Sequence, residues 1–347
     1  MIRGLIRPPR LAAGDRIAAV TLSWGGPGAF PHRYEAGARQ LEEAFGVRVR
    51  PTEHALRDPD WISRNPRARA DDLLAAFADP DTHAIVATIG GEDSIRILPF
   101  LELDVISTNP KVFLGFSDTT ITHMACLRAG LTSFYGPSIM AGFGENTGLF
   151  PYLADGVRRT LFEPETALVW PENRDGWTVE HLDWADPSLQ ARPRTLTPSS
   201  GWRWHGGLAG EGPIVAGCLE VLEWIRGSVW FPDLDGAVLA IETSEEGPPP
   251  VHVARFLRSL AVTGELAGLA GIVFGRPGGA NVASDEHAGY DDAVLEVVRA
   301  EQGLADLAVV TGVDVGHTDP AWTIPIGVPT RVDPEARTVT FLEAGVR

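Results

Sequence analysis

Apolar and polar positions follow two alternating periods along the first half of the chain. The short apolar runs that predict strands lie at 17–23, 47–51, 84–89 and 112–116. The stretches with helical spacing lie at 34–45, 67–77, 93–101 and 120–127. This alternation predicts a parallel sheet with helices on both faces, and in such sheets ligands bind at the carboxyl ends of the strands.

A second pattern begins near Gly206. Its expected strands are 237–241, 271–274, 308–313 and 338–342, and its expected helices are 219–226, 251–259 and 290–300. Between the two patterns the chain is irregular, and five of its ten tryptophans fall between Trp170 and Trp204. We therefore expect three parts: 1–165, a Trp-rich connecting segment at 166–205, and 206–347. Such a segment is often a lid or binding loop, although for most of its rings we favour packing onto the body.

The composition narrows the class of partner. A formal net charge of −17 disfavours a nucleic-acid polymer, whose phosphates the chain would repel, but it leaves room for a small nucleotide in a local pocket. Cys126 and Cys218 lie in apolar surroundings and are expected to be buried thiols rather than a disulfide. No signal peptide or membrane-length apolar run is present, so we expect a cytoplasmic protein.

The most informative segment is the turn that follows the apolar run at 112–116. The run ends at Gly115-Phe116-Ser117-Asp118, and a helical pattern starts at Thr120. A serine at a sharp strand-to-helix turn is typical of a nucleophile elbow, which exposes the hydroxyl above the sheet. The alternative is that Ser117 and Asp118 only cap the helix.

A nucleophilic serine needs a base and an acidic group that orients it. His317 lies beside Gly316 at the end of a predicted strand, where a sheet would present a base; the alternative is a histidine in a surface turn. The acidic group could be Glu242, Asp314 or Asp319. We favour Glu242 because it ends the apolar strand 237–241, and a carboxylate there is costly without a partner.

Two backbone N–H groups are candidates for an oxyanion hole. One belongs to Asp118, directly after the serine, and the other to Gly91 at the end of a neighbouring strand.

Other chemistries find little support. Zinc-ligand spacing and a phosphate-binding loop are missing, and Gly25-Gly26-Pro27-Gly28 lacks the dinucleotide spacing. We therefore expect no metal and no cofactor.

Six separated blocks resemble the serine LD-carboxypeptidases in order and spacing over nearly the whole chain. They are Ala87-Thr88-Ile89-Gly90-Gly91-Glu92-Asp93-Ser94, Gly115-Phe116-Ser117-Asp118-Thr119-Thr120, Phe134-Tyr135-Gly136-Pro137, Ile241-Glu242-Thr243-Ser244-Glu245, Phe274-Gly275-Arg276-Pro277 and Gly316-His317-Thr318-Asp319-Pro320. The first block and the Trp-rich segment are most similar to the branch of microcin C immunity proteins. One departure is Ala216-Gly217-Cys218-Leu219, where relatives often carry Gly-Gly-Asn-Leu.

The resemblance implies a fold and a set of roles. The fold would be α/β, with a doubly wound, mainly parallel N-terminal domain and a smaller β-rich C-terminal domain with helices. Ser117 would be the nucleophile, His317 the base and Glu242 its orienting acid, and the active site would lie between the domains of a homodimer subunit. The oxyanion donors would be the backbone N–H groups of Gly91 and Asp118. The residues expected to contact substrate are Gly90, Glu92, Trp177, Trp184, Trp202 and Trp204.

Three functions remain open from the sequence. The first is hydrolysis of the amide-type bond of a peptidyl- or aminoacyl-nucleotide of the microcin C type, with an aromatic ring of the connecting segment stacked on the base. The second keeps the serine chemistry but acts on LD-peptides of murein. The third is a nucleotide-binding protein without catalysis.

Overall fold

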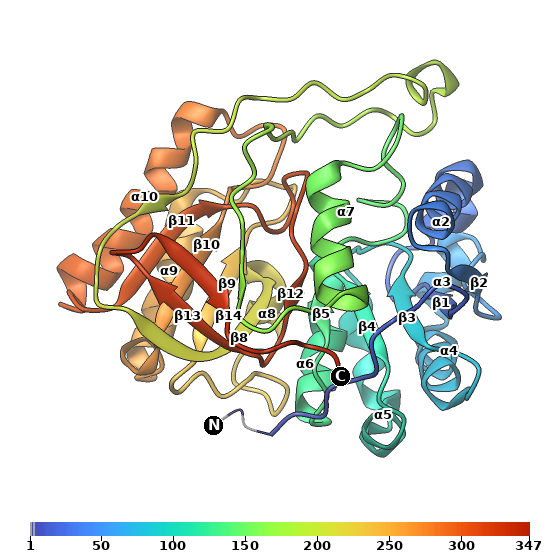
Figure 1. The fold of residues 1–347 in the computed structure, drawn as a ribbon, viewed down its shortest axis with the longest axis horizontal. Helices are drawn as coiled ribbons and strands as arrows, with labels where there is room; N and C mark the ends of the chain where they lie inside the picture. The colour runs from blue at the N-terminus through green and yellow to red at the C-terminus, as the bar shows by residue number, and fades with distance from the viewer. Residues whose placement is uncertain (1, 3) are drawn as a thin grey trace.

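The first sheet in the computed structural model, which describes residue 2 and residues 4–347, has the strand order β12-β5-β4-β3-β1-β2 (Figure 1). Its strands are β1 Arg16–Val20, β2 Arg48–Pro51, β3 Ala84–Ala87, β4 Val112–Gly115, β5 Phe134–Tyr135 and β12 Ile324–Pro325. The pairs among β1 to β5 are parallel, and only β12 runs antiparallel to its neighbour. The order 2-1-3-4-5 confirms the predicted doubly wound sheet.

Alternate strand residues send side chains to opposite faces of this sheet, and helices cover both. Ala19, Val86 and Leu114 pack on one side with residues of α2, whereas Ala18 and Ile85 pack on the other with residues of α4. The helices of this part are α1 Gly26–Ala29, α2 Pro31–Phe45, α3 Pro59–Arg64, α4 Pro66–Ala78, α5 Leu103–Thr108, α6 Thr120–Arg128 and α7 Pro151–Val157, with 3₁₀-helices η1 Ser94–Phe100 and η2 Ser117–Thr119 and a π-helix η3 Arg158–Phe162.

The second sheet has the order β6-β14-β13-β8-β9-β10-β11-β7, in which β8 to β11 are parallel to one another. Its strands are β6 Leu168–Val169, β7 Arg203–Trp204, β8 Gly210–Cys218, β9 Val238–Glu242, β10 Gly271–Gly275, β11 Ala308–Val313, β13 Pro329–Asp333 and β14 Thr338–Phe341. The accompanying helices are α8 Leu219–Trp224, α9 Pro250–Val262 and α10 His287–Leu295, with η4 Pro187–Leu189, η5 Leu266–Gly268, η6 Ser284–Glu286 and the π-helix η7 Glu296–Glu301.

Several elements differ from the sequence-based expectation, among them β8, β13 and η1. The nine-residue strand β8 was not predicted because its first residues are rich in Gly and Pro, which normally interrupt strands. Its glycines are required by close backbone packing, since a Cβ on Gly212 would lie 1.8 Å from the carbonyl oxygen of Gly236. Strand β13 was also missed, and the helix expected at 93–101 is the 3₁₀-helix η1, which contains Pro99.

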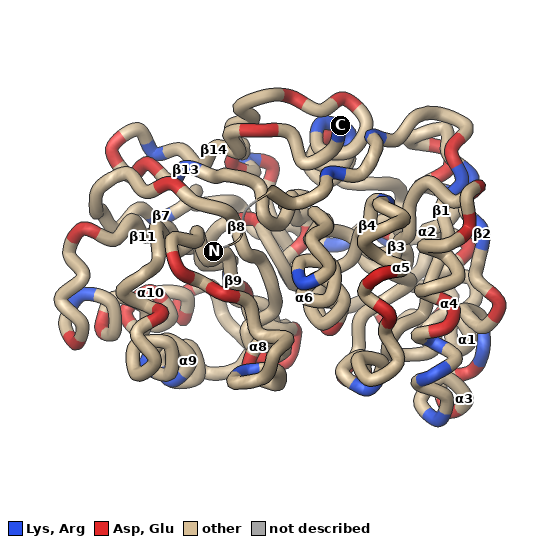
Figure 2. The backbone as a smooth tube through the Cα atoms, turned by 90° about the horizontal axis from the view of Figure 1, so that it is seen from below, with Lys and Arg blue, Asp and Glu red and all other residues tan. Residues whose placement is uncertain are grey.

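The two sheets lie beside each other, and segments from both halves of the chain join them (Figure 1). Strand β12, from the C-terminal half, pairs with β5 of the first sheet. The N- and C-terminal segments run together, with Arg10 N donating to Arg347 O at 3.0 Å. The connecting segment crosses from one half to the other (Figure 1), and acidic residues are spread over both halves (Figure 2). Within the described part of the chain, no helix is both long and apolar enough to cross a membrane.

Candidate active site

Ser117 occupies a strained turn between β4 and α6. Its φ is 63°, in the left-handed region that non-glycine residues seldom adopt. Gly90, at the end of neighbouring β3, allows the close approach, because a Cβ there would lie 2.9 Å from Ser117 Oγ. This strand, turn and helix arrangement is the geometry of a nucleophile elbow.

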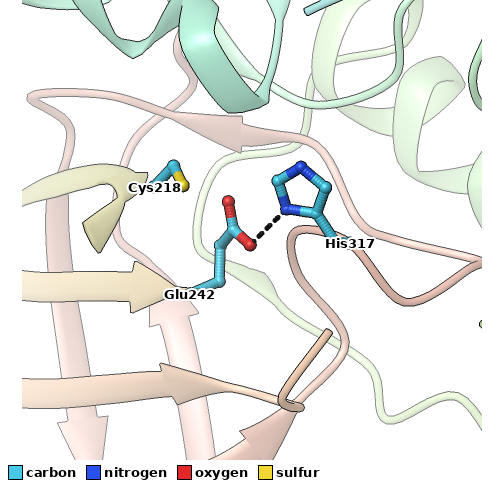
Figure 3. Close-up of side chains that lie close together, drawn as sticks. All are labelled: Cys218, Glu242 and His317. Carbon is cyan, nitrogen blue, oxygen red and sulfur yellow. Dashed lines mark hydrogen bonds and ion pairs between the residues drawn. The ribbon is translucent and has the colours of Figure 1, made fainter. Parts of the chain in front are cut away.

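His317 and Glu242 lie beside this serine, although they come from the other sheet. His317 Nε2 is 3.0 Å from Ser117 Oγ, and His317 Nδ1 is 2.7 Å from Glu242 Oε2. Glu242 is the last residue of β9, and His317 lies in the turn after β11; Figure 3 shows the two side chains facing each other. Gly316 is required here, with φ 89°, because a Cβ would lie 2.2 Å from Glu242 Oε2.

Burial and charge set the protonation of this pair. Burial raises the pKa of Glu242, and the neighbouring His317 opposes that rise. Burial alone would lower the pKa of His317, but Glu242 and Glu245 together outweigh it and hold this pKa well above its ordinary value. The pair therefore favours a charged imidazolium beside a carboxylate.

Tyr135, at the end of β5, connects Ser117 to Glu242. Its hydroxyl donates to Glu242 Oε1 at 2.5 Å and accepts from Ser117 N at 3.0 Å. The side chain is buried, so both bonds form away from water. The sequence analysis gave Tyr135 no role, although it lies in one of the blocks that carry the family resemblance.

We predict that Tyr135→Phe lowers kcat by about 10- to 100-fold with little change in KM. The change leaves Ser117 N and Glu242 Oε1 without their buried partner, which misplaces two reacting groups without touching the cavity wall. Steady-state kinetics test this, with Tyr152→Phe as control, because that buried hydroxyl donates to Pro171 O and not to Glu242. Equal kcat in the wild type and Tyr135→Phe would contradict the positioning role.

The two candidate oxyanion donors are held together by the side chain of Asp118. Its Oδ2 accepts from the backbone N of Asp93 at 2.9 Å and of Ser94 at 2.8 Å, and its Oδ1 accepts from Ser94 Oγ at 2.6 Å. Burial raises the pKa of Asp118, and bonds from serines and backbone N–H groups oppose the rise. These contacts tie the loop after β3, which contains Gly91, to the serine turn.

Gly91 itself can only be glycine at this place. Its φ is 141°, and a Cβ would lie 2.4 Å from Ser23 Oγ and 2.9 Å from Trp24 N. Together with Gly90 it forms part of the wall around Ser117. Its backbone is therefore exposed to whatever binds beside the serine.

A cavity of about 510 Å³ opens beside the serine and histidine. Of the predicted site residues, its wall contains Gly90, Gly91, Ser117, Trp184 and His317. The residues of the wall that the sequence analysis did not single out include Trp24, Phe30, Arg33, Arg194 and Glu245. Trp24, Phe30 and Arg33 follow β1. Their position after the first predicted strand could have indicated a place in the binding site, because ligands bind at the carboxyl ends of parallel strands.

The other predicted substrate contacts lie outside this wall. Glu92 is exposed beyond it. Trp202 is buried and its Nε1 donates to Asp314 Oδ2 at 2.7 Å, and Trp177 is buried beneath the Arg276 guanidinium. Trp204 belongs to β7 at the edge of the second sheet. These three rings therefore pack onto the body of the protein, as the sequence analysis favoured for most rings of this segment.

The connecting segment is fixed beside the turn that contains His317 by backbone and ionic contacts. Thr178 N donates to Asp319 O at 2.8 Å, and Asp319 N donates to Thr178 O at 3.0 Å. Arg194 Nη2 donates to Asp319 Oδ2 at 2.8 Å and also contacts Glu145. The segment thereby holds Trp184 in the cavity wall, where its ring meets Phe30 edge to face at 5.8 Å and lies 4.9 Å from the Arg33 guanidinium.

One group of metal-ligand side chains occurs among the described residues. Cys218, Glu242 and His317 offer ligand atoms within 4.8 Å of one another (Figure 3). Glu242 and His317 are bonded to each other, and burial together with nearby carboxylates holds the pKa of the Cys218 thiol well above its ordinary value. A metal here would have to displace both the hydrogen bond and the thiol proton.

Comparison with known proteins defines the class. Two family models match, the LD-carboxypeptidase N-terminal domain over residues 17–136 and the LD-carboxypeptidase C-terminal domain over residues 211–332. The fold and these matches place the molecule among the carboxypeptidases. The chain belongs to the LD-carboxypeptidase family.

Individual relatives are similar over nearly their full length. The microcin C7 self-immunity protein MccF of Escherichia coli is 27% identical over 335 residues, covering 96% of this chain and 94% of the relative. An MccF-like protein from Streptococcus pneumoniae, solved in complex with AMP, is 30% identical with a TM-score of 0.83, covering 94% and 98%. MccF in complex with aspartyl sulfamoyl adenosine is 25% identical with a TM-score of 0.86, covering 99% and 100%.

Proposed function

We propose that this chain is a serine hydrolase that cleaves the amide-type bond between an aminoacyl or peptidyl group and a nucleotide. The observation that carries the proposal is that one cavity contains both the Ser117–His317 pair and an aromatic wall formed by Trp184 and Phe30. The related structures with AMP and with aspartyl sulfamoyl adenosine support a nucleotide as the leaving part.

In the proposed reaction, neutral His317 accepts the Ser117 proton at Nε2 while Oγ attacks the acyl carbon. Glu242 accepts from Nδ1 and stabilises the imidazolium that forms. The N–H groups of Gly91 and Asp118 donate to the oxyanion. Nε2 then protonates the leaving nitrogen, and a water molecule releases the acyl group from Ser117 by the same sequence of proton transfers.

The aromatic wall gives the site its proposed preference for a nucleotide. A purine ring stacked on Trp184 gains about 1–3 kcal/mol, as base stacking on aromatic side chains generally does. Arg33 is buried and its Nη1 donates to Asn146 Oδ1 at 2.6 Å, so its guanidinium is fixed over the Trp184 indole and orients that ring in the cavity wall. The indole is half-buried, which leaves part of it available to a ligand.

The experiment compares aspartyl sulfamoyl adenosine with a murein tetrapeptide as substrates. We expect the wild type to hydrolyse the acyl-nucleotide. Trp184→Ala is expected to raise the KM for this substrate by about 5- to 150-fold with little change in kcat, because stacking is lost equally in the ground state and the transition state. Trp224→Ala is the control, since that exposed ring on α8 lies outside the cavity. Turnover of the tetrapeptide alone would favour the murein carboxypeptidase, and binding without any turnover would favour the non-catalytic nucleotide-binding protein.

A further inference from the structure

Glu245 contacts the same nitrogen of His317 that faces the nucleophile. Its Oε2 lies 2.9 Å from Nε2, while Ser117 Oγ lies 3.0 Å from Nε2. The Glu245 side chain is 72% exposed, whereas that of His317 is 7% exposed. Glu245 therefore reaches from the cavity mouth to the proposed base, and two groups share one imidazole nitrogen.

The contact of His317 Nε2 with Glu245 and its proposed role as base toward Ser117 require different protonation states of the imidazole. A carboxylate only accepts, so the bond to Glu245 needs a proton on Nε2. Nδ1 also needs its proton to donate to Glu242, which makes the ring an imidazolium. An imidazolium cannot take the Ser117 proton, so this arrangement is a resting state that must change before the reaction starts.

The loop after β9 is anchored so that Glu245 is directed at His317. Ser244 N and Ser244 Oγ donate to Glu220 Oε1 at 3.0 and 2.6 Å, and Thr243 Oγ1 accepts from Gly278 N at 3.3 Å. The hydrogen bond to His317 lowers the pKa of Glu245 to about 2, so its carboxylate stays charged at neutral pH. Glu245 thus remains available to a cation.

We propose that Glu245 is a specificity-determining residue that binds the free α-ammonium of the acyl group and, without it, keeps His317 protonated. The inference rests on the proposed function. When the acyl carbon lies at Ser117 Oγ, the α-nitrogen of the acyl group is about 2.5 Å from that carbon. This distance is similar to the 3.0 Å from Oγ to His317 Nε2 and the 2.9 Å from Nε2 to Glu245 Oε2, so the α-nitrogen can reach Glu245. When the ammonium takes the carboxylate, the Nε2 proton passes to water and neutral His317 can accept the Ser117 proton.

This assignment distinguishes the acyl groups. An aminoacyl-nucleotide carries a free α-ammonium, whereas a peptidyl-nucleotide and a murein peptide have an amide at that nitrogen and offer no charge to Glu245. The enzyme would therefore favour aminoacyl- over peptidyl-nucleotides.

Other charged or titratable groups around His317 come from every neighbouring element: Glu242 (β9), Cys218 (β8), Glu220 (α8), Tyr135 (β5), Asp118 (serine turn), His181 and Arg194 (connecting segment), Glu246 (loop after β9), and Asp319 (its own turn).

The test uses full-length wild type, Glu245→Gln and the matched control Glu246→Gln, an exposed neighbour outside the cavity wall. We measure kcat/KM for aspartyl sulfamoyl adenosine and its Nα-acetyl derivative. The wild type and Glu246→Gln are expected to prefer the free amine by about 10- to 100-fold, the scale of one charge-assisted hydrogen bond. In Glu245→Gln the two rates become similar.

The His317 titration is measured separately by NMR, without substrate. Loss of the Glu245 charge lowers the pKa of His317, so the acid limb of kcat/KM also moves to lower pH. An unchanged amine preference in Glu245→Gln, or an unchanged titration, overturns the inference. If the titration moves but the wild type hydrolyses neither compound, the proposed function fails while the Glu245–His317 coupling stands.

Discussion

Ser117→Ala is expected to lower turnover of the acyl-nucleotide by about 10⁴- to 10⁶-fold, because removal of a triad nucleophile ends covalent catalysis. The remaining activity would come from binding and the oxyanion donors alone. Substrate affinity is expected to change little, since Oγ is small and the aromatic wall is untouched. Single-turnover kinetics and calorimetry of the same variant measure the two quantities.

Relief of backbone strain gives the Ser117 variant a second readout. Because φ is 63°, alanine inherits the strain and thermal stability is expected to stay close to wild type, whereas Ser117→Gly adopts this φ freely and is expected to be slightly more stable. Ser107→Ala on α5, outside the cavity wall, is the control for turnover. Substantial hydrolysis by Ser117→Ala would remove Ser117 from the role of nucleophile.

Glu242→Gln is expected to lower kcat by about 10³- to 10⁴-fold, the second-largest effect. The carboxylate accepts from His317 Nδ1 and from Tyr135 OH with its two oxygens. An amide has a single oxygen, so it can satisfy one of these donors while its NH₂ group faces the other, and it does not stabilise the imidazolium.

The pH dependence separates this role from a loss of folding. Without the Glu242 charge the pKa of His317 falls, so the residual activity of Glu242→Gln is expected to reach its plateau at lower pH than the wild type. The pH–rate profile of a variant with a normal thermal unfolding transition checks this. A variant with a wild-type profile and wild-type kcat would show that Glu242 does not orient the base.

The positions around the serine were accessible from the sequence because parallel sheets put strand ends at one edge. Gly91 and Ser117 follow β3 and β4, so their proximity follows from the alternating pattern and from strand neighbours. His317 and Glu242 were recognised as strand-end residues too. Their strand-end positions favoured them as base and orienting acid, and the family resemblance implied the same pairing, but the pattern alone does not say how two sheets meet.

The segment boundaries 1–165, 166–205 and 206–347 and the homodimer stay predictions. Choosing among the tryptophans needed the fold, since the four candidate rings share one irregular segment whose spacing does not distinguish wall from core. The structure puts Trp184 in the cavity wall and buries Trp177 and Trp202.

The sequence by itself determined the doubly wound sheet, the serine turn and the strand-end residues around it, because these depend on local hydrophobic period and on glycine at tight turns. Only the tertiary structure decided that Tyr135 joins Ser117 N to Glu242 and that Glu245 reaches His317 Nε2. The Tyr135–Glu242 contact joins residues 107 positions apart on the two sheets, and the Glu245–His317 contact joins a loop residue to a buried ring. They depend on how two sheets pack and how one loop is anchored, which no local pattern encodes.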